Sequence, residues 1–313
     1  MKSYLITGGC GFIGVNLVKR LCARGDAVRV FDNLSTGRHE DAASLGAQVI
    51  VGDVRDARAI SDAAKGADVV VHLAAHTRVI ESITDPDLNF DINVVGTKNV
   101  LQACRGAGVQ KLVFASTGGA ILGDQKPPTH EEMVPRPISP YGAGKLAGEA
   151  YCSAFAGSFG LNTVALRFSN VYGPFSYHKG SVVAQFFRNL IQGKPLIVYG
   201  DGSQTRDYVF VEDLIEAVLL AEQIDTPGDV FQIASGRETS LNELIALIRK
   251  VVSDRDLSIF YEPARRGEVL RNYARIEKAR NTLGYEPRVP LEEGLHRTWQ
   301  WFTAAERAHS AKV

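Results

Sequence analysis

The chain has 313 residues, of which 45% are hydrophobic and 22% are charged, and 35 Lys+Arg balance 35 Asp+Glu. This composition is typical of a soluble globular protein, and the even charge argues against nucleic acid or an anionic membrane as a partner. No apolar run reaches the length of a membrane-spanning helix, and the chain begins with a strand pattern rather than a signal peptide. The cysteines and histidines show no metal-ligand spacing and no C-x-x-C. We therefore expect no metal, reduced thiols and a cytoplasmic protein.

A glycine-rich loop connects an apolar strand pattern at residues 4–6 to a helical pattern at residues 15–24. Its glycines 9, 11 and 14 match G-x-G-x-x-G, and 8, 11 and 14 match G-x-x-G-x-x-G. Glycine allows a tight turn and close approach of the backbone to a pyrophosphate, which then binds the free N–H groups of the helix N-terminus. The alternative is a plain strand-to-helix turn, but the strand before and the helix after favour a dinucleotide site.

A second strand pattern, residues 27–31, ends at Asp32, 18 residues after Gly14. A carboxylate at about this spacing binds the adenosine ribose 2′-OH and repels a 2′-phosphate, which favours NAD over NADP. The alternative is a strand-end cap. The polar loop that follows, residues 33–37, could continue around the ribose. After a third strand at residues 49–51, Asp53 either accepts a hydrogen bond from the adenine amino group or caps the helix that begins near Ala57.

A valine-rich pattern at residues 68–72 predicts a strand buried on both faces, and small residues follow it where a flat cofactor could lie. Residues 86–108 predict a long helix interrupted by Gly96, and residues 111–115 a fifth strand. Alternating strands and helices with right-handed crossovers form a doubly wound parallel sheet. Ligands of such sheets bind beyond the carboxyl ends of the strands, where all of these polar segments lie.

Tyr141 and Lys145 form a Y-x-x-x-K pair, which on a helix points both side chains to one face. A lysine ammonium favours the phenolate. Lowering a tyrosine pKa from about 10 toward 7 needs roughly 4 kcal/mol, which the lysine and a positive nicotinamide ring could supply in a desolvated site. Tyr141 would then be a general base. The alternative is an exposed helix pair, but the preceding sheet pattern favours catalysis.

Together these residues resemble the extended short-chain dehydrogenase/reductase superfamily, in particular its NAD-dependent nucleotide-sugar epimerases and dehydratases, and most of all the UDP-glucose 4-epimerase group. The matching motifs are Thr7 to Gly14, Asp32 to Gly37, Gly52 to Arg55, His72 to Ala75, Asn93 to Thr97, Ser139 to Lys145, Arg167 to Pro174 and Tyr199 to Asp207. The resemblance implies an α/β fold: a doubly wound (Rossmann) NAD domain of residues 1–166, to which 206–236 return, and a smaller mixed α/β substrate lobe of residues 167–205 and 237–313.

The resemblance also implies a mechanism. Tyr141 would take a proton from the sugar 4-OH as hydride passes from C4 to NAD, and the 4-keto sugar would rotate and receive the hydride on its other face. Lys145 would hold the nicotinamide ribose. The implied catalytic residues are Thr117, Tyr141 and Lys145. The implied cofactor-binding residues are Gly8, Gly11, Phe12, Ile13, Gly14, Asp32, Asn33, Ser35, Thr36, Gly37, Asp53, Val54, Leu73, Ala74, Ala75, Asn93, Ser116, Tyr141 and Lys145. The implied substrate-binding residues are Thr77, Thr117, Tyr141, Asn170, Ser181, Val182, Tyr199, Arg206, Arg265 and Asn272.

The sequence departs from the family pattern after the fifth strand. The usual catalytic Ser or Thr position is occupied by Gly118, so Thr117 or Ser116 must supply the hydroxyl, and we favour Thr117. Dehydratases and decarboxylases carry an acid just after this hydroxyl to protonate a leaving group. Gly119 and Ala120 stand there instead, which favours epimerisation.

Substrate choice depends on the second half of the chain. Asn272 aligns with the position that sets the room for the C2 substituent, and its small size would admit an N-acetyl group. Lys179 either meets a substrate carboxylate or is a solvated loop lysine. Helices are predicted at residues 180–191, 211–222, 241–252, 275–283 and 291–304, with a capping box at Ser240 and Glu243 and a frayed tail from 304.

The leading hypothesis is an NAD-dependent UDP-hexose 4-epimerase acting on UDP-glucose and UDP-galactose. UDP-N-acetylglucosamine and UDP-glucuronate 4-epimerases are alternatives, as are a nucleotide-sugar decarboxylase or dehydratase and a non-catalytic NAD-binding regulator. Family analogy predicts a homodimer through the helices at residues 86–108 and 141–159, paired as a four-helix bundle.

Overall fold

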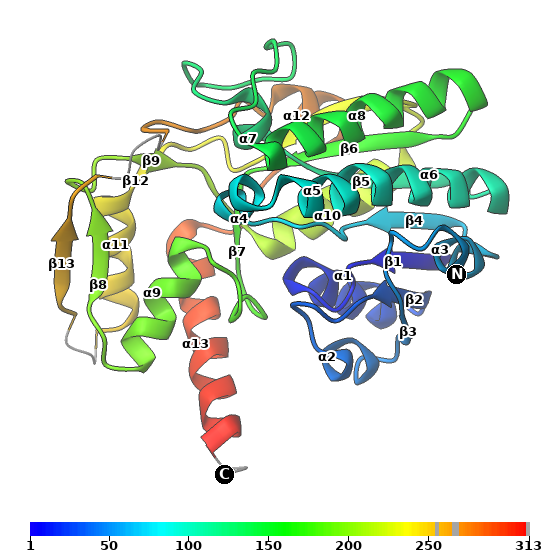
Figure 1. Ribbon diagram of the computed structural model, residues 1–313. Helices are drawn as coiled ribbons and strands as arrows, with labels where there is room; N and C mark the ends of the chain where they lie inside the picture. Colours follow the sequence, from blue (N-terminus) through cyan, green and yellow to red (C-terminus); the bar gives the residue numbers. More distant parts are fainter. Residues whose placement is uncertain (254–256, 265–268, 311–313) are drawn as a thin grey trace.

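The computed structural model describes residues 1–253, 257–264 and 269–310. Its centre is a seven-stranded parallel sheet with the order β11-β6-β5-β4-β1-β2-β3 (Figure 1). The strands are β1 (Ser3–Thr7), β2 (Ala27–Asp32), β3 (Gln48–Val51), β4 (Val69–His72), β5 (Lys111–Thr117), β6 (Thr163–Phe168) and β11 (Asp229–Ile233). From β1 the chain adds β2 and β3 toward one edge of the sheet, and from β4 it adds β5, β6 and β11 toward the other edge. This change of direction between β1 and β4 confirms the predicted doubly wound sheet.

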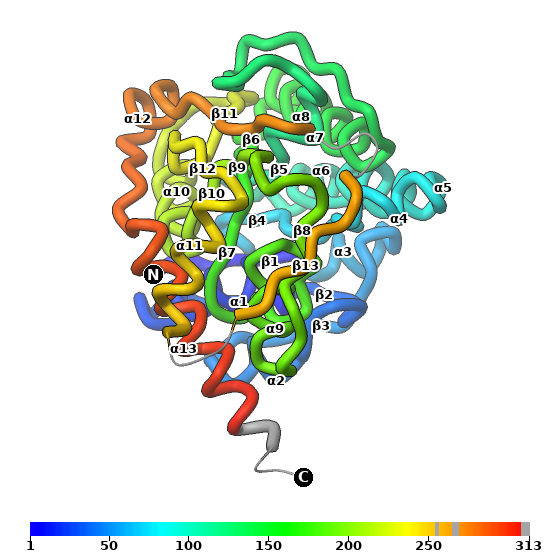
Figure 2. Tube along the Cα trace, turned by 90° about the vertical axis from the view of Figure 1, so that its left-hand side faces the viewer, coloured from blue at the N-terminus to red at the C-terminus, as the bar shows by residue number. Residues whose placement is uncertain are grey.

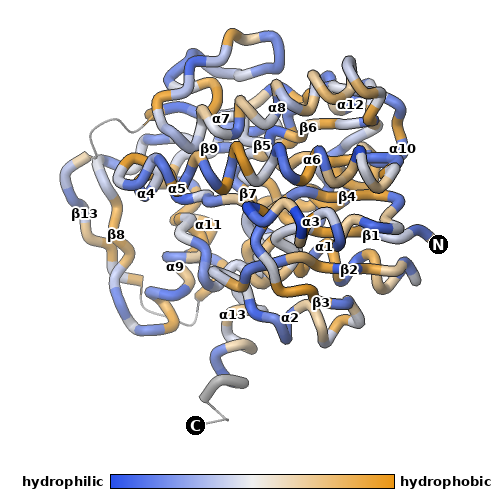
Figure 3. Tube along the Cα trace, turned by 45° about the vertical axis from the view of Figure 1, so that its right-hand side comes forward, coloured by the Kyte–Doolittle hydropathy of each residue, from blue (hydrophilic) through white to orange (hydrophobic). Residues whose placement is uncertain are grey.

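Helices cover both faces of this sheet. One face packs on α1 (Phe12–Ala23), α2 (His39–Ala43), α10 (Val211–Gln223) and α12 (Glu277–Leu283), and the other on α3 (Ala57–Ala64), α6 (Gly96–Ala107) and α8 (Pro140–Phe159). Alternate strand residues supply the two cores: Ile6 and Val30 point to the first, Leu5 and Phe31 to the second. Strands buried on both faces are largely apolar, and β4, with the sequence VVVH, is mostly hydrophobic in Figure 3.

The helix predicted at residues 86–108 has three parts. They are α5 (Pro86–Phe90), a single π-helical segment η1 (Asp91–Val95) and α6. The irregularity therefore lies just before Gly96 rather than at it. A Cβ atom at Gly96 would stand 2.6 Å from Val54 Cγ2, so glycine is needed for close packing there. Segments of π-helix are often found at functional sites.

A second, smaller lobe follows the sheet (Figure 2). Its strands form three pairs: β7 (Asn170–Tyr172) with β10 (Tyr208–Phe210), β8 (Leu196–Tyr199) with β13 (Ile259–Glu262), and β9 (Thr205–Arg206) with β12 (Thr239–Ser240). Its helices are α9 (Val182–Ile191), α11 (Leu241–Val251) and α13 (Leu291–Ser310). They share a core that includes Phe187, Ile248 and Phe302. Because β11 and α10 join the first sheet, the chain passes between the lobes more than once, which supports the proposed division.

The predicted helices of this lobe are present with shifted ends. The α9 helix begins two residues later than predicted because Ser181 is its N-cap, and α12 also begins two residues later. The predicted frayed tail is wrong as far as Ser310, because α13 continues to that residue and projects at the bottom of Figure 1. The capping box of Ser240 and Glu243 is confirmed. Among the described residues, no helix combines the length and the apolar character needed to cross a membrane.

Candidate functional site

The glycine loop between β1 and α1 is packed so tightly that no side chain fits at Gly8 or Gly14. Gly8 has φ +70°, and a Cβ atom there would stand 2.6 Å from the backbone nitrogen of Ala74. A Cβ atom at Gly14 would stand 2.5 Å from the Cα atom of Gly9. The first contact joins the ends of β1 and β4, and the second brings the helix close to the loop. The backbone is thus exposed for close approach of a pyrophosphate.

The N-terminus of α1 provides the N–H groups for an anion. Its N-cap is Gly11, and the first intrahelical bond runs from Val15 N to Gly11 O at 2.9 Å. The amides before this bond point out of the helix and are free for a phosphate. They belong to three predicted residues: Phe12, Ile13 and Gly14.

Asp32 joins the end of β2 to the glycine loop. Its Oδ2 accepts from Cys10 N at 2.9 Å and its Oδ1 from Leu34 N at 2.8 Å. Burial raises the pKa of this carboxyl, and the two amide bonds act in the opposite direction. A Cβ atom at Gly37 would stand 2.2 Å from Cys10 O, so the predicted ribose loop also packs on the glycine loop. A carboxylate has lone pairs to spare for ribose hydroxyls, so this cradle is suited to NAD.

Asp53 does not cap the following helix, so that interpretation is wrong. The N-cap of α3 is Asp56, whose Oδ1 accepts from the amides of the first helical turn. Asp53 pairs with Arg55 at 2.8 Å and accepts from Asn33 Nδ2 at 3.1 Å. The hydrogen bonds from Arg55 hold the pKa of this carboxyl well below its usual range. The predicted contact with adenine stays a prediction, as do those of Ser35, Thr36 and Val54.

His72, at the end of β4, is a buried neutral histidine. Its Nδ1 lies 2.6 Å from Thr7 Oγ1 and its Nε2 lies 3.0 Å from Thr97 Oγ1. Burial lowers the pKa of His72 to about 3. This side chain therefore fixes β4 between β1 and α6. The predicted small residues Leu73, Ala74 and Ala75 follow it and are half-buried.

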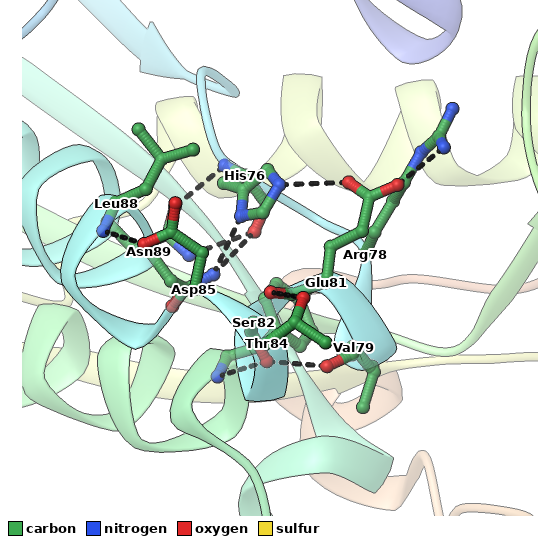
Figure 4. Close-up of polar contacts among 11 residues, drawn as sticks. His76, Arg78, Val79, Glu81, Ser82, Thr84, Asp85, Leu88 and Asn89 are labelled. Carbon is green, nitrogen blue, oxygen red and sulfur yellow. Dashed lines mark hydrogen bonds and ion pairs between the residues drawn. The ribbon is translucent and has the colours of Figure 1, made fainter.

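The Asn93 side chain holds the loop after β4 through hydrogen bonds to its backbone. Its Oδ1 accepts from His76 N at 2.8 Å, and its Nδ2 donates to His76 O at 3.0 Å. The His76 ring points toward Glu81, whose carboxylate also binds Arg78 (Figure 4). The sequence analysis missed His76 and the short helix α4 (Val79–Thr84). Asn93 thus fixes the backbone of His76 in the loop after β4, and its predicted contact with the cofactor stays a prediction.

A hydroxyl of α4 reaches the start of α8. Ser82 Oγ donates to Val79 O at 2.6 Å and accepts from Tyr141 N at 3.2 Å. The α8 helix itself begins with Ser139, whose side chain accepts from Gly142 N. Pro140 occupies the first helical position, where its missing N–H costs nothing. Tyr141 is thus held at the N-terminal end of α8, beside the end of β5.

The Tyr141 phenol meets Thr117. Burial raises the pKa of Tyr141 to about 12, and a hydrogen bond with Thr117 acts in the opposite direction. The other candidate hydroxyl, Ser116, donates instead to Glu149 at 2.6 Å. The two hydroxyls of β5 therefore have different partners, and the one beside Tyr141 is the predicted Thr117.

Lys145 lies one turn further along α8. It is 4% exposed, its Nζ donates to Ala115 O at 2.7 Å, and burial lowers its pKa to about 8. We expected this ammonium to lower the pKa of Tyr141. In the structure burial raises the pKa of Tyr141, and the hydrogen bond with Thr117 acts in the opposite direction. The expectation concerned Lys145 together with a bound nicotinamide ring, so it stays a prediction. Lys145 and the positive ring of a bound nicotinamide are the charges that would offset this burial.

Side chains from distant segments occupy the space beside the two glycines that follow Thr117. A Cβ atom at Gly118 would stand 2.4 Å from Gln232 Oε1, and one at Gly119 would stand 2.2 Å from Asn272 Nδ2. A side chain at 118 would therefore have to displace the end of Gln232 of β11. The Gly119 contact brings Asn272 beside the short helix α7 (Gly118–Leu122).

The predicted substrate residues other than Asn272 are described by their own elements and bonds. Arg206 Nη1 donates to Thr205 O at 2.7 Å and to Val269 O at 2.9 Å. The hydroxyl of Ser181 is buried and has no hydrogen-bond partner among the described residues. Asn170 begins β7, Val182 begins α9, Tyr199 ends β8, and Thr77 is exposed before α4. Arg265 lies outside the described residues.

Lys179 is not a solvated loop lysine, so that interpretation is wrong. Its Nζ donates to Val171 O at 2.7 Å and lies 5.1 Å from the centre of the Phe12 ring. Burial lowers the pKa of Lys179 to about 8. The lysine thus connects the second lobe to the first turn of α1, which the sequence pattern gave no means to foresee.

The chain is similar to known proteins along nearly its whole length. Residues 4–234 match the model of the NAD dependent epimerase/dehydratase family. A putative UDP-glucose 4-epimerase of Methanocaldococcus jannaschii is 38% identical over 95% of this chain and 97% of its own. A UDP-glucose 4-epimerase of Mycolicibacterium smegmatis is 39% identical over the same shares.

Three solved structures share the fold and differ in the UDP-sugar that each contains. UDP-glucose 4-epimerase of Thermotoga maritima with UDP-glucose has a TM-score of 0.92 and 37% identity, covering 97% of this chain and 99% of that one. UDP-N-acetylglucosamine 4-epimerase of Methanobrevibacter ruminantium, in complex with UDP-N-acetylmuramic acid, has a TM-score of 0.91, 30% identity and the same coverage. A UDP-glucuronic acid 4-epimerase variant of Bacillus cereus, in complex with a fluorinated UDP-glucuronic acid and NAD, has 0.90, 28% and the same coverage. The chain thus belongs to the NAD dependent epimerase/dehydratase family.

Proposed function

We propose that this enzyme interconverts C4 epimers of a UDP-hexose, with UDP-glucose and UDP-galactose as the first pair. The observation that carries the proposal is the contact of Tyr141 with Thr117 at the carboxyl end of β5, with Lys145 on the same helix face. No acid stands at positions 119 and 120 to protonate a leaving hydroxyl, which favours epimerisation over dehydration or decarboxylation. The same catalytic residues argue against a non-catalytic NAD-binding regulator.

The residues of the site have separate tasks. Bound NAD supplies a reversible acceptor for the C4 hydride. Tyr141 takes the proton of the 4-hydroxyl and returns it, and Thr117 orients the phenol through their hydrogen bond. Lys145 adds the positive charge that favours the phenolate. Asp32 and the α1 N-terminus are the proposed holders of the ribose and the pyrophosphate.

The second lobe supplies the proposed nucleotide site. Ser181 occupies the N-cap position of α9, and its buried hydroxyl makes no capping bond and has no partner among the described residues. We propose that this hydroxyl binds a phosphate oxygen at the helix N-terminus. Arg206 and Arg265 are proposed to bind the same diphosphate. From the family resemblance, the segment Lys194 to Tyr199 is proposed to lie against the uracil and Asn170 to contact the substrate near the diphosphate or the hexose.

The identity of the sugar is the finer part of the proposal. Asn272 is small, and its contact with Gly119 places it near Thr117, so an N-acetyl group at C2 is the second candidate. Lys179 is bonded to Val171 O, which leaves UDP-glucuronate without this partner for its carboxylate. We therefore rank a UDP-glucuronate 4-epimerase third.

The test is incubation of the purified protein with a panel of UDP-sugars, each assayed for its C4 epimer. We expect interconversion of UDP-glucose and UDP-galactose at a higher kcat/KM than for the N-acetylated or acidic sugars. Release of CO2 or accumulation of a 4-keto sugar would contradict the epimerase assignment and support the decarboxylase or dehydratase alternative. The free thiols of the four cysteines support the proposed cytoplasmic setting.

We also propose that two copies associate through α5, α6 and α8. Large side chains stand exposed on these helices: Phe90 is 55%, Tyr151 42% and Phe159 48% exposed. Apolar groups in this number on packed helices are typical of an interface. Light scattering should give the mass of a dimer, and Tyr151→Glu, which leaves the core untouched, should give a monomer. A monomeric wild-type protein at micromolar concentration would contradict this proposal.

A further inference from the structure

Glu149 of α8 is a buried carboxylate that the proposed reaction does not use. It is 5% exposed, and its Oε1 accepts from Ser116 Oγ at 2.6 Å and from Arg167 Nε at 2.9 Å. Its Oε2 accepts from Arg167 Nη2 at 2.8 Å. Arg167 is 3% exposed and lies directly opposite Ser116 in the parallel register of β5 and β6. The two parallel hydrogen bonds of the bidentate pair fix its geometry. Separating the two residues would leave an uncompensated charge in the protein interior, so the pair stays together.

The same face of α8 carries the proposed catalytic pair. Tyr141, Lys145 and Glu149 follow one another at intervals of four residues, so their side chains form one row along the helix. Each of them bonds to a different residue at the end of β5. The partners are three consecutive residues, in the order Thr117, Ala115 and Ser116. The row thus joins the catalytic helix to the strand that carries the catalytic hydroxyl.

We infer that Glu149 is a positioning residue of the reaction. Through Ser116 it fixes the end of β5 against α8, and through its charge it keeps Lys145 protonated. The inference rests on the proposed roles of Tyr141 and Lys145.

The surroundings of Lys145 make Glu149 its negative neighbour. Burial lowers the pKa of Lys145, and the nearby Cys152 and Glu149 act in the opposite direction. Burial also raises the pKa of the Cys152 thiol far above its usual value, so this thiol stays neutral and Glu149 carries the negative charge. The titratable groups that interact with Lys145 are His72 on β4 and Glu149 and Cys152 on α8, and Arg167 on β6 pairs with Glu149. His72 and Cys152 are neutral, so loss of the Glu149 charge removes the negative neighbour of the lysine and leaves the Arg167 cation of the pair uncompensated.

The test is the pH dependence of kcat, measured with the UDP-sugar that the wild-type protein epimerises. Glu149→Gln keeps the shape and an acceptor for Arg167 but removes the charge. We expect its alkaline limb to move down by about one pH unit, with about a tenfold loss of kcat above the limb and a smaller loss below it. Glu149→Asp keeps the charge and should return the limb to the wild-type position, although its shorter side chain lowers kcat at every pH.

A second variant and a second readout separate positioning from mere stability. Ser116→Ala retains the Glu149 charge and should lower kcat about tenfold at every pH with KM unchanged. Its matched control is Thr163→Val, which removes a buried bond of 2.8 Å from β6 to Cys152 O of α8. The control should lower stability and leave kcat and the alkaline limb in place. The titration of Lys145 can also be followed by NMR of ¹³C-lysine in the free protein, where Glu149→Gln should lower its midpoint.

An alkaline limb that stays in place in Glu149→Gln, or moves equally in Thr163→Val, overturns the inference. If Glu149→Gln does not fold, Ser116→Ala decides, and a kcat equal to that of Thr163→Val overturns the positioning role. A wild-type protein that epimerises no UDP-sugar counts against the proposed function instead. In that case the NMR midpoint of Lys145 in Glu149→Gln and Glu149→Asp still tests the inference.

Discussion

The side-chain amide of Asn272 packs against the backbone of Gly119, so that a Cβ atom at position 119 would stand 2.2 Å from Asn272 Nδ2. Gly119 is the second residue after Thr117, whose hydroxyl meets Tyr141. The contact therefore brings a residue of the second lobe next to the proposed reaction centre. It also means that the size of residue 119 controls where the Asn272 amide lies.

Gly119→Ala should change the preference for the C2 substituent with little loss of stability. The added methyl group meets the flexible end of Asn272, so the amide can turn away and the free energy of unfolding should change by about 1 kcal/mol or less. The displaced amide narrows the proposed sugar site, so kcat/KM should fall several-fold more for UDP-N-acetylglucosamine than for UDP-glucose. The control is Gly106→Ala on α6, where a Cβ atom meets nothing within 4 Å. Equal ratios for both variants would show that Asn272 does not border the sugar.

Tyr141→Phe should abolish epimerisation while leaving the fold intact. A positioned acid–base group contributes about 10²–10⁴-fold to a rate, so we expect a loss of about 10³-fold in kcat. Stopped assays of the C4 epimer, at matched NAD content, measure this loss. Tyr151→Phe on the exposed side of the same helix is the control and should keep wild-type activity. Retained activity in Tyr141→Phe would refute the proposed mechanism.

The hydroxyl at position 117 should be needed for the same step. Thr117→Val is expected to lose about 10²-fold in kcat, because the phenol loses its hydrogen-bond partner. Thr117→Ser keeps the hydroxyl and should retain most of the activity. If Ser116→Ala proves more damaging than Thr117→Val, the assignment of the hydroxyl to Thr117 is wrong.

The patterns that could be predicted from the sequence are local ones. The glycine loop, the valine-rich strand β4 and the Tyr141–Lys145 spacing each need only neighbouring residues, because a strand, a turn or a helix face is defined within a few positions. The order of strands then places their polar ends at one edge of the sheet. The sheet, the NAD cradle and the pair on α8 are therefore all visible before any tertiary contact is known.

The features that could not be predicted depend on contacts between distant segments. Gln232 fills the space beside Gly118, and Lys179 crosses to Phe12, although nothing near either residue in the chain marks these partners. The burial of Tyr141, which raises its pKa, likewise depends on distant segments and could not be predicted from its neighbour one helical turn away. The π-helical segment η1 lies against α8, where a Cβ atom at Gly144 would stand 3.2 Å from Asn93 Cβ, and the sequence pattern indicated only an interruption at Gly96.

Acid should destabilise the protein through His72. Its pKa is about 3 in the folded state against 6.5 ordinarily, because burial disfavours the charged ring. Between these values the unfolded chain binds a proton that the folded chain does not, so the free energy of unfolding falls as the pH falls below 6.5. The slope from this group approaches about 1.4 kcal/mol per pH unit. Urea unfolding of His72→Gln from pH 7 to 4 should show a smaller slope than wild type. His296→Gln, at an exposed position of α13, should keep the wild-type slope, and equal slopes in all three proteins would contradict the assignment.

Gly8→Ala should damage the cofactor cradle far more than Gly25→Ala. Both glycines have left-handed backbone, with φ of +70° and +85°, so alanine costs about 1–2 kcal/mol at either position. At Gly25 nothing lies within 4 Å of the new Cβ atom, whereas at Gly8 it would stand 2.6 Å from Ala74 N and 2.8 Å from Ala74 Cα. These backbone atoms belong to the turn after β4 and cannot move away as a side chain can, so the loop and the turn must separate.

We therefore expect Gly8→Ala to lower the free energy of unfolding by about 1–3 kcal/mol more than Gly25→Ala does. It should also release NAD on gel filtration, whereas wild type and Gly25→Ala keep it. Urea unfolding measures the first effect, and the absorbance of the NAD extracted from each purified protein measures the second. Because an epimerase returns NAD unchanged in each cycle, tight retention is expected of the intact cradle. Wild-type protein that exchanges NAD as readily as Gly8→Ala would show that the close contact of Gly8 with Ala74 is not what holds the cofactor.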